Sequence, residues 1–218
     1  MTSAPGRYQL IVFDLDGVLV DTESGHARAY DDLWARVGIE GPEYGRIAGI
    51  RTAEVVSRAT ASLAASDEQR AEWVRFKQER ARHYLTGSTR PFPDVGPTVT
   101  ALYRAGFKLA VGTGSSRRTA TTVLEAAGIL GLFAAVVTGD DVSRGKPAPD
   151  IFLAAFGQTG SAPEAALVVE DTRVGLEAAN ASGAWSAAVR SGARLASERF
   201  IGTYPDLGAL ARTLQEPA

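Results

Sequence analysis

The sequence predicts an α/β fold, a Rossmann-like parallel sheet flanked by helices, with an inserted all-helical segment. Three observations support this prediction. Short apolar, β-branched runs alternate with Ala- and Leu-rich stretches of helical spacing. Each apolar run is continuous, as expected of strands buried on both faces of a parallel sheet. Residues 22–85, in contrast, carry helical patterns and no strand-like run.

The alternating part of the chain defines the predicted core. The apolar runs that predict strands are residues 8–13, 107–112, 133–138, 166–169 and 184–189. The stretches with helical spacing between them are residues 95–105, 117–127, 150–158 and 174–181. Strands that alternate with helices of this length indicate βαβ units with right-handed crossovers.

The inserted segment is predicted to contain only helices. Residues 23–37, 53–65 and 67–84 have helical patterns, and Gly41-Pro42 predicts a turn between the first two. The stretch 87–94 (GSTRPFPD) is typical of a linker and leads back to the core. We therefore expect two domains: an α/β core of residues 1–19 and 92–218, and a helical domain of residues 20–91.

Composition narrows the range of functions. The 218 residues are 45% hydrophobic and 22% charged, with a net charge of −2, so no basic field attracts nucleic acid or an anionic membrane. No apolar run approaches the ~20 residues of a membrane helix, and the N-terminus lacks the apolar region of a signal peptide. We expect a cytoplasmic monomer. The absence of cysteine excludes thiolate catalysis and disulfides, and His26 and His83 are too few for a multi-histidine metal site.

Polar side chains follow the predicted strands where each strand ends, and in an open parallel sheet ligands bind at that edge. They comprise carboxylates, hydroxyls and a lysine: Asp14, Asp16, Thr113, Gly114, Ser115, Lys146, Glu170 and Asp171. Such a set suits phosphoryl transfer. A carboxylate can attack phosphorus, further carboxylates can hold Mg²⁺, and a lysine can balance charge on the transferring oxygens. Asp14 and Asp16 alternate along an extended segment and can face one site.

Four segments resemble, in order, the four motifs of the haloacid dehalogenase superfamily: DLDGV at 14–18, VGTGS at 111–115, GKP at 145–147 and VEDT at 169–172. The runs DGVLVDTE and GKPAPDIF are similar to the β-phosphoglucomutase and sugar-phosphatase branch. The resemblance covers nearly the whole chain, with residues 20–91 as the helical cap. It implies a Mg²⁺-dependent phosphatase that acts on a small phosphorylated metabolite, such as a sugar phosphate, through an aspartyl-phosphate.

The resemblance also implies a role for each site residue. Asp14 resembles the nucleophile and Asp16 the general acid/base. Thr113, Gly114, Ser115 and Lys146 resemble the phosphate-binding residues. The implied metal ligands are Asp14, Asp16 through its backbone carbonyl, Glu170 and Asp171. In the cap, Thr22 and His26 match positions that help to place the acid/base residue, and Arg51 is the candidate substrate contact.

Other interpretations of the same residues stay open. Asp14 to Gly17 can form a turn, Thr113 to Ser116 can cap a helix, and a cap histidine such as His26 can be structural. A β-phosphoglucomutase is the main alternative, for which Arg46, Arg51 and Arg58 are candidate cap cations. Ala48 stands where that branch would have a lysine, however, and Arg51 falls beside the arginine position of the family.

Three further alternatives fit the sequence less well. Haloacid dehalogenases lack the second aspartate of the first motif, so Asp16 argues against them. Phosphonate hydrolases use a cap lysine as a Schiff base, whereas Lys77, the only cap lysine, lies far along the cap. A catalytically inactive binding or regulatory module would be expected to have lost Asp14, Asp16 or Lys146, and all three are present.

Overall fold

A computed structural model describes residues 8–86 and 90–215. Its core is a six-stranded sheet with the strand order β3-β2-β1-β4-β5-β6, in which every neighbouring pair is parallel. The strands are β1 (Leu10–Phe13), β2 (Lys108–Gly112), β3 (Ala135–Val137), β4 (Ala166–Glu170), β5 (Trp185–Val189) and β6 (Phe200–Tyr204). The predicted α/β class is confirmed, and the five predicted strands are β1 to β5.

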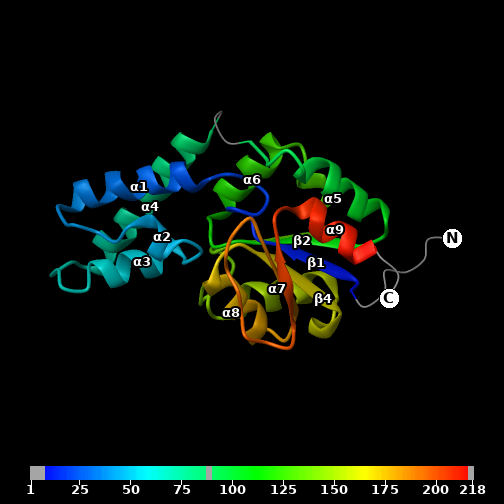
Figure 1. Ribbon diagram of the computed structural model, residues 1–218. Coiled ribbons are helices and arrows are strands. Elements are labelled where there is room, and N and C mark those ends of the chain that lie inside the picture. Colours follow the sequence, from blue (N-terminus) through cyan, green and yellow to red (C-terminus); the bar gives the residue numbers. More distant parts are fainter. Residues whose placement is uncertain (1–7, 87–89, 216–218) are drawn as a thin grey trace.

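Helices cover both faces of this sheet (Figure 1). The core helices are α5 (Val95–Arg104), α6 (Arg117–Ala126), α7 (Asp150–Thr159), α8 (Arg173–Ala181) and α9 (Leu207–Gln215), with short 3-10 turns at Leu130–Leu132 and Pro163–Ala165. Ile11 and Phe13 of β1 pack in the cluster that contains residues of α5, α6 and α9, whereas Leu10 and Val12 pack in the cluster with α7 and α8. Burial on both sides explains why the run is apolar without alternation.

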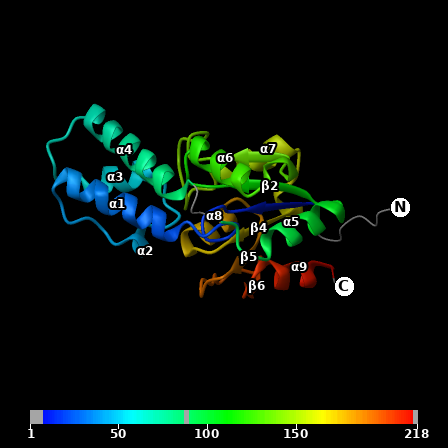
Figure 2. The ribbon, with the colours of Figure 1, turned by 90° about the horizontal axis from the view of Figure 1, so that it is seen from above.

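In the described part of the cap, up to Thr86 and from Arg90, four helices lie to one side of the sheet in both views (Figures 1 and 2). They are α1 (Glu23–Val37), α2 (Tyr44–Ile47), α3 (Thr52–Ala59) and α4 (Asp67–Leu85). The cap has its own apolar cluster, built around Leu33, Trp34 and Val56. At the start of α4, Ser66 and Gln69 form a reciprocal capping box, which satisfies backbone amides that the helix leaves free. None of the helices in residues 8–86 and 90–215 is long and apolar enough to span a bilayer.

The chain leaves and re-enters the core at two neighbouring backbone points. Val20 forms an isolated antiparallel bridge with Pro91, and the amide of Phe92 donates to the carbonyl of Leu19 at 3.2 Å. The turn before this crossing requires a glycine at position 17. Gly17 has a φ of +82°, and a Cβ there would lie 2.0 Å from Oδ2 of Asp171. The crossing therefore packs directly against the end of β4.

The structure adds elements that the sequence analysis did not predict: α2, β6 and α9. The helical prediction for 53–65 extends too far, because α3 ends at Ala59. Within the predicted linker, residues 87–89 lie outside the described part of the chain, as do the ends of the predicted core domain at 1–7 and 216–218.

Candidate active site

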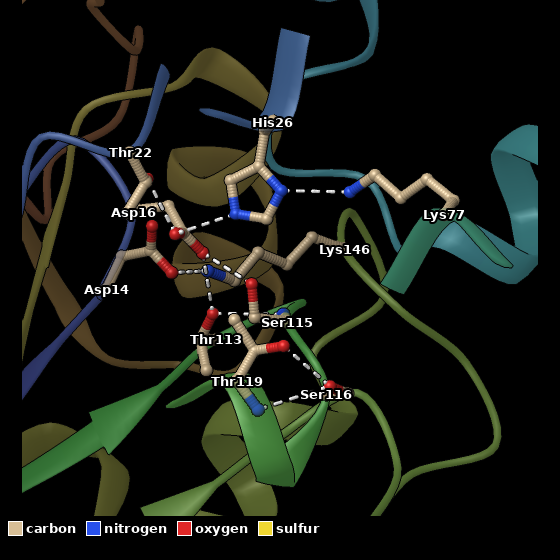
Figure 3. Close-up of polar contacts among 10 residues, drawn as sticks. All are labelled: Asp14, Asp16, Thr22, His26, Lys77, Thr113, Ser115, Ser116, Thr119 and Lys146. Carbon is tan, nitrogen blue, oxygen red and sulfur yellow. Dashed lines mark hydrogen bonds and ion pairs between the residues drawn. The ribbon is translucent and has the colours of Figure 1, made fainter. Parts of the chain in front are cut away.

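The polar residues of the sheet edge come together at the carboxyl ends of the strands (Figure 3). Asp14 follows β1, Thr113 follows β2, and Glu170 is the last residue of β4. Lys146 comes from the loop between β3 and α7, and the peptide bond that joins it to Pro147 is cis. Residues far apart in the sequence thus converge because parallel strands end at one edge.

A buried ion-pair network occupies the centre of the site. Nζ of Lys146 lies 2.6 Å from Oδ1 of Asp14 and 2.6 Å from Oε1 of Glu170, and all three side chains are almost fully buried. Burial alone would lower the pKa of Lys146, but the two carboxylates raise it above its usual range, so the lysine stays protonated. Burial raises the pKa of Asp14, and Lys146 lowers it. The negative charges of Glu170, Asp16 and Asp171 raise it further, so the pKa lies well above its usual range.

The donor set beside this network suits a divalent cation. One carboxylate oxygen from each of Asp14, Glu170 and Asp171 lies within 4.8 Å of the others. Oδ1 of Asp171 is buried and has no hydrogen-bond partner among the residues that the structure describes. Burial, and then the charge of Glu170, raise the pKa of Asp171 to about 7, although Lys146 acts in the opposite direction. An all-oxygen, anionic pocket of this kind matches the ligand preference of Mg²⁺.

Asp16 is held by four neighbours. Its Oδ1 accepts from the hydroxyl of Thr22 at 2.7 Å and lies 3.2 Å from Nε2 of His26. Its Oδ2 accepts from the hydroxyls of Thr113 at 3.1 Å and Ser115 at 2.8 Å. Burial would raise the pKa of Asp16, but His26 and the hydroxyl donors outweigh burial and hold this pKa well below its usual range. The carboxylate is therefore ionised in this arrangement.

The segment after β2 orients two hydroxyls towards the site. The amide of Ser115 donates to Oγ1 of Thr113 at 3.0 Å, which fixes the turn through Gly114. Ser116, the next residue, is the N-cap of α6, and its hydroxyl accepts from the amide of Thr119. The capping alternative thus applies to Ser116, while Thr113 and Ser115 face Asp16 (Figure 3).

Lys77 is a site residue that the sequence analysis missed. Its Nζ lies 2.9 Å from Nδ1 of His26 and 4.3 Å from the centre of the Tyr30 ring, and the residue is only 4% exposed. Its distance along the cap suggested that it lies away from the site, and that interpretation is wrong. A signal was present, because Ala81 and Leu85 follow at four-residue intervals, and these three are the buried residues of α4.

Arg51 lies at the boundary of cap and core, but its guanidinium is bound to backbone oxygens. Nη1 donates to the carbonyl of Val142 at 2.7 Å, and Nη2 donates to that of Ser143 at 2.8 Å. The other candidate cap cations, Arg46 and Arg58, are exposed. In this conformation the guanidinium of Arg51 thus binds a core loop, and a substrate contact at Arg51 stays a prediction.

Two spaces adjoin the site. A small one of about 30 Å³ lies over Asp14 and Asp16 and is lined on the cap side by His26, Tyr44 and Lys77. A cavity of about 370 Å³ opens beside it and reaches from Asp16 and Asp171 to Asp21 and Phe92.

Comparison with known proteins decides the family. The model of the family described as haloacid dehalogenase-like hydrolase matches residues 8–183. The chain belongs to this family. Fructose-1-phosphate phosphatase YqaB of Escherichia coli (strain K12) is 34% identical over 179 residues, which cover 81% of this chain and 94% of the relative.

Two further comparisons agree with this membership. Phosphoglycolate phosphatase of Aquifex aeolicus (strain VF5) is 32% identical over 178 residues, or 80% of this chain and 81% of the relative. The crystal structure of CbbY from Rhodobacter sphaeroides in complex with phosphate superposes with a TM-score of 0.80 at 25% identity, covering 93% of this chain and 96% of that chain. The haloacid dehalogenase-like fold thus extends over both core and cap.

Proposed function

We propose that this protein is a Mg²⁺-dependent phosphatase that hydrolyses a small phosphorylated metabolite, a sugar phosphate, through an aspartyl-phosphate at Asp14. The observation that carries the proposal is the contact between Asp14 and Lys146 beside the acidic group formed with Glu170 and Asp171. Relatives named as phosphatases of fructose 1-phosphate and phosphoglycolate support the same reaction class.

The chemistry assigns a task to each residue. The Asp14 carboxylate attacks phosphorus and forms the acyl-phosphate bond while the bond to the leaving oxygen breaks, and Asp16 supplies the proton to that oxygen. Asp16 then accepts a proton from water, whose oxygen attacks phosphorus and releases Asp14. Lys146 and the hydroxyls of Thr113 and Ser115, with the backbone at Gly114, bind the phosphoryl oxygens.

Substrate entry also prepares Asp16 for its role as an acid. Thr113 and Ser115 now donate to Asp16, and a bound phosphate would compete for both hydroxyls. Loss of these donors, together with the nearby phosphate charge, raises the pKa of Asp16 from its depressed resting value. His26 and Thr22 keep the carboxyl in place during this change.

Asp14, the backbone carbonyl of Asp16, Glu170 and Asp171 are the residues that would hold Mg²⁺. When bound, this ion would offset the repulsion between the Asp14 carboxylate and the phosphate. The cap, residues 20–91, supplies the remaining contacts of the substrate and excludes water. We further propose that the enzyme is a cytoplasmic monomer without nucleic-acid or membrane partners. The net charge of −2 supports the absence of such partners, because it provides no basic field to attract them.

Hydrolysis is favoured over phosphosugar mutation. A mutase must bind a second phosphate on its cap, which requires a free cation there. Arg51 is bound to carbonyls of the core, and position 48 is an alanine. Arg46 and Arg58 are exposed and line neither of the two spaces at the site. Lys77 is the buried cap cation of the site, and it contacts His26.

A phosphorylated-metabolite panel tests the proposal. We expect wild-type protein to release phosphate from sugar phosphates and p-nitrophenyl phosphate with Mg²⁺ and to be inactive in excess EDTA. Asp14→Asn should abolish turnover, whereas Asp31→Asn, at an exposed position of α1, should not. Activity in Asp14→Asn or in EDTA would contradict the mechanism. Coupled detection of glucose 6-phosphate formed from β-glucose 1-phosphate separates a mutase from a phosphatase.

A further inference from the structure

The N-terminus of cap helix α3 is fastened to the core loop between β3 and α7. Arg51, the N-cap residue of α3, directs its guanidinium into this loop and donates to the carbonyls of Val142 at 2.7 Å, Ser143 at 2.8 Å and Gly139 at 3.4 Å. The guanidinium of arginine has five N–H donors in one plane, so a single side chain can donate hydrogen bonds to several carbonyl oxygens at once. One cap side chain thereby holds the backbone of residues 139–143 in the first part of the loop.

Glu54, one turn further along α3, binds the other end of the same loop. Its Oε1 accepts from the amide of Gly145 at 2.7 Å and lies 3.5 Å from Nη2 of Arg51. The residue after Gly145 is Lys146, which contacts both Asp14 and Glu170. A charge-assisted hydrogen bond from the cap thus ends one residue away from the lysine of the active site.

The loop approaches α3 so closely that position 145 has no room for a side chain. A Cβ at Gly145 would lie 2.9 Å from Cβ of Arg51 and 3.0 Å from Oε1 of Glu54. A Cβ at Gly139 would lie 3.3 Å from the stem of Arg51 and 2.6 Å from the carbonyl of Gly114. Both ends of the loop are therefore shaped to receive the two cap side chains.

We propose that Arg51 and Glu54 form a clasp through which the closed cap positions the loop of Lys146. Both are positioning residues: they touch neither the nucleophile nor the metal ligands, and they act through the backbone at 139–145. When the cap swings away, the clasp opens and the loop loses four hydrogen bonds from the cap. The lysine is then held in place less firmly, so catalytic power is coupled to closure.

The test combines four single variants, and the double alanine variant of Arg51 and Glu54, with two kinds of measurement. Glu54→Ala removes the acceptor of the Gly145 amide, and Arg51→Ala removes the donors to the carbonyls. Glu54→Gln keeps an acceptor oxygen and is the conservative rescue. Arg58→Ala is the matched control, because Arg58 is an exposed arginine of the same helix. Amide hydrogen exchange of the peptide 139–146 is measured in the resting protein, and kcat and KM are measured with p-nitrophenyl phosphate and Mg²⁺.

We expect exchange in the 139–146 peptide to become roughly tenfold faster in Glu54→Ala and Arg51→Ala, with kcat reduced by roughly tenfold and KM changed by less than about threefold. Glu54→Gln should restore most of both values, and Arg58→Ala should match wild type. The double variant should lose less than the product of the single losses, because both residues serve one clasp.

Other outcomes overturn the inference. Unchanged exchange in both alanine variants would show that the cap does not hold the loop. A raised KM in Arg51→Ala alone, with Glu54→Ala like wild type, would make Arg51 a substrate ligand instead. The kinetic part rests on the proposed function, but the exchange part does not. A wild-type protein that hydrolyses no phosphate ester would refute the function and leave the exchange data to decide the clasp.

Discussion

The ammonium group of Lys77 lies 2.9 Å from Nδ1 of His26, and Nε2 of the same ring lies 3.2 Å from Asp16. A protonated lysine can only donate, so Nδ1 must accept and Nε2 must carry the hydrogen that is donated to Asp16. Burial first, and then Lys77, lowers the pKa of His26, which keeps the imidazole neutral. A cap lysine thus selects the tautomer that orients the acid/base residue.

Replacement of Lys77 by methionine should stabilise the protein at neutral pH. Burial lowers the pKa of Lys77 from 10.5 to about 8, so the folded state holds the charge at a cost of roughly 3 kcal/mol at pH 7. Between pH 8 and 10.5 the unfolded chain binds the proton more than the folded one, so wild-type stability rises there relative to Lys77→Met. Urea unfolding at pH 7 and pH 10 measures this difference.

The increase in the free energy of unfolding caused by Lys77→Met should therefore be largest at pH 7 and become smaller towards pH 10. Phosphatase activity should fall at both pH values. The contact with the Tyr30 ring offsets part of the gain, because a cation over an aromatic face contributes about 0.5–2 kcal/mol. A gain that does not vary with pH would rule out the buried charge as its source.

Asp16→Asn should separate substrates by their leaving groups. p-Nitrophenolate leaves without a proton, whereas a sugar alkoxide requires one. We expect a burst of about one equivalent of p-nitrophenol followed by slow turnover, because the asparagine cannot activate water, and no rapid sugar release. Rapid-quench measurement of both products tests this. Equal losses for the two substrates, without a burst, would remove Asp16 from the acid/base role.

Gly175→Ala should weaken metal binding through Glu170. A Cβ at position 175 would lie 2.0 Å from Cδ of Glu170, so the carboxylate must move from Lys146. We expect the Mg²⁺ concentration for half-maximal activity to rise by roughly tenfold or more. The added methyl group should also lower the free energy of unfolding by about 1–3 kcal/mol, because it overpacks the site.

Gly157→Ala is the matched control for this experiment. Gly157 lies in α7, where an added Cβ meets no atom within 4 Å, and alanine favours the helix by up to about 1 kcal/mol. A Mg²⁺ titration of both variants, followed by thermal unfolding, gives the comparison. Equal Mg²⁺ requirements would mean that Glu170 has no influence on the metal.

Asp94→Asn should lower stability above pH 4 and have little effect below it. Asp94 accepts from Nη2 of Arg190 at 2.5 Å and from the amide of Leu207, the first residue of α9, at 2.8 Å. Partial burial would raise the pKa of Asp94, but the hydrogen bond and the charge of Arg190 lower it below its usual value. The contribution is present above the unfolded pKa and is lost as the pH falls through the folded one.

We expect a loss of roughly 1–2 kcal/mol for Asp94→Asn at pH 7, from hydrogen bonds to a charged acceptor. Urea unfolding at pH 7 and pH 3 measures it, with Asp31→Asn as an exposed control. If the two stability curves stay parallel down to pH 3, the ion pair with Arg190 contributes nothing.

The sheet edge could be predicted from the sequence because one rule places its residues. Continuous apolar runs indicated β1 to β5, and parallel strands end together, so Asp14, Thr113 and Glu170 were expected to lie close, with Lys146 in a loop at the same edge. The edge strand β6 was not predicted because it is half-exposed, contains Gly202 and pairs with β5 through a register shift, so it lacks the continuous buried apolar pattern of the other strands.

The cap could be predicted as helices but not as a surface. Helix α4 carries charges nearly all round, so the four-residue spacing of Lys77, Ala81 and Leu85 is a weak indication of its buried side. Only the packed structure brings Lys77 to His26 and turns Arg51 towards a core loop. These contacts depend on how the cap helices pack against the sheet edge, which local sequence patterns do not encode.

The bridge between Val20 and Pro91 has a consequence for how such enzymes diversify. Because the bridge and the hydrogen bond from Phe92 to Leu19 hold the two connecting segments together, we expect that the residues between them could be replaced while the two ends keep their positions. A different cap inserted between these two positions would be joined to the same nucleophile, Asp14, and would supply different contacts to the substrate. It would also have to bring its own partners for Asp16, since Thr22 and His26 travel with the insert.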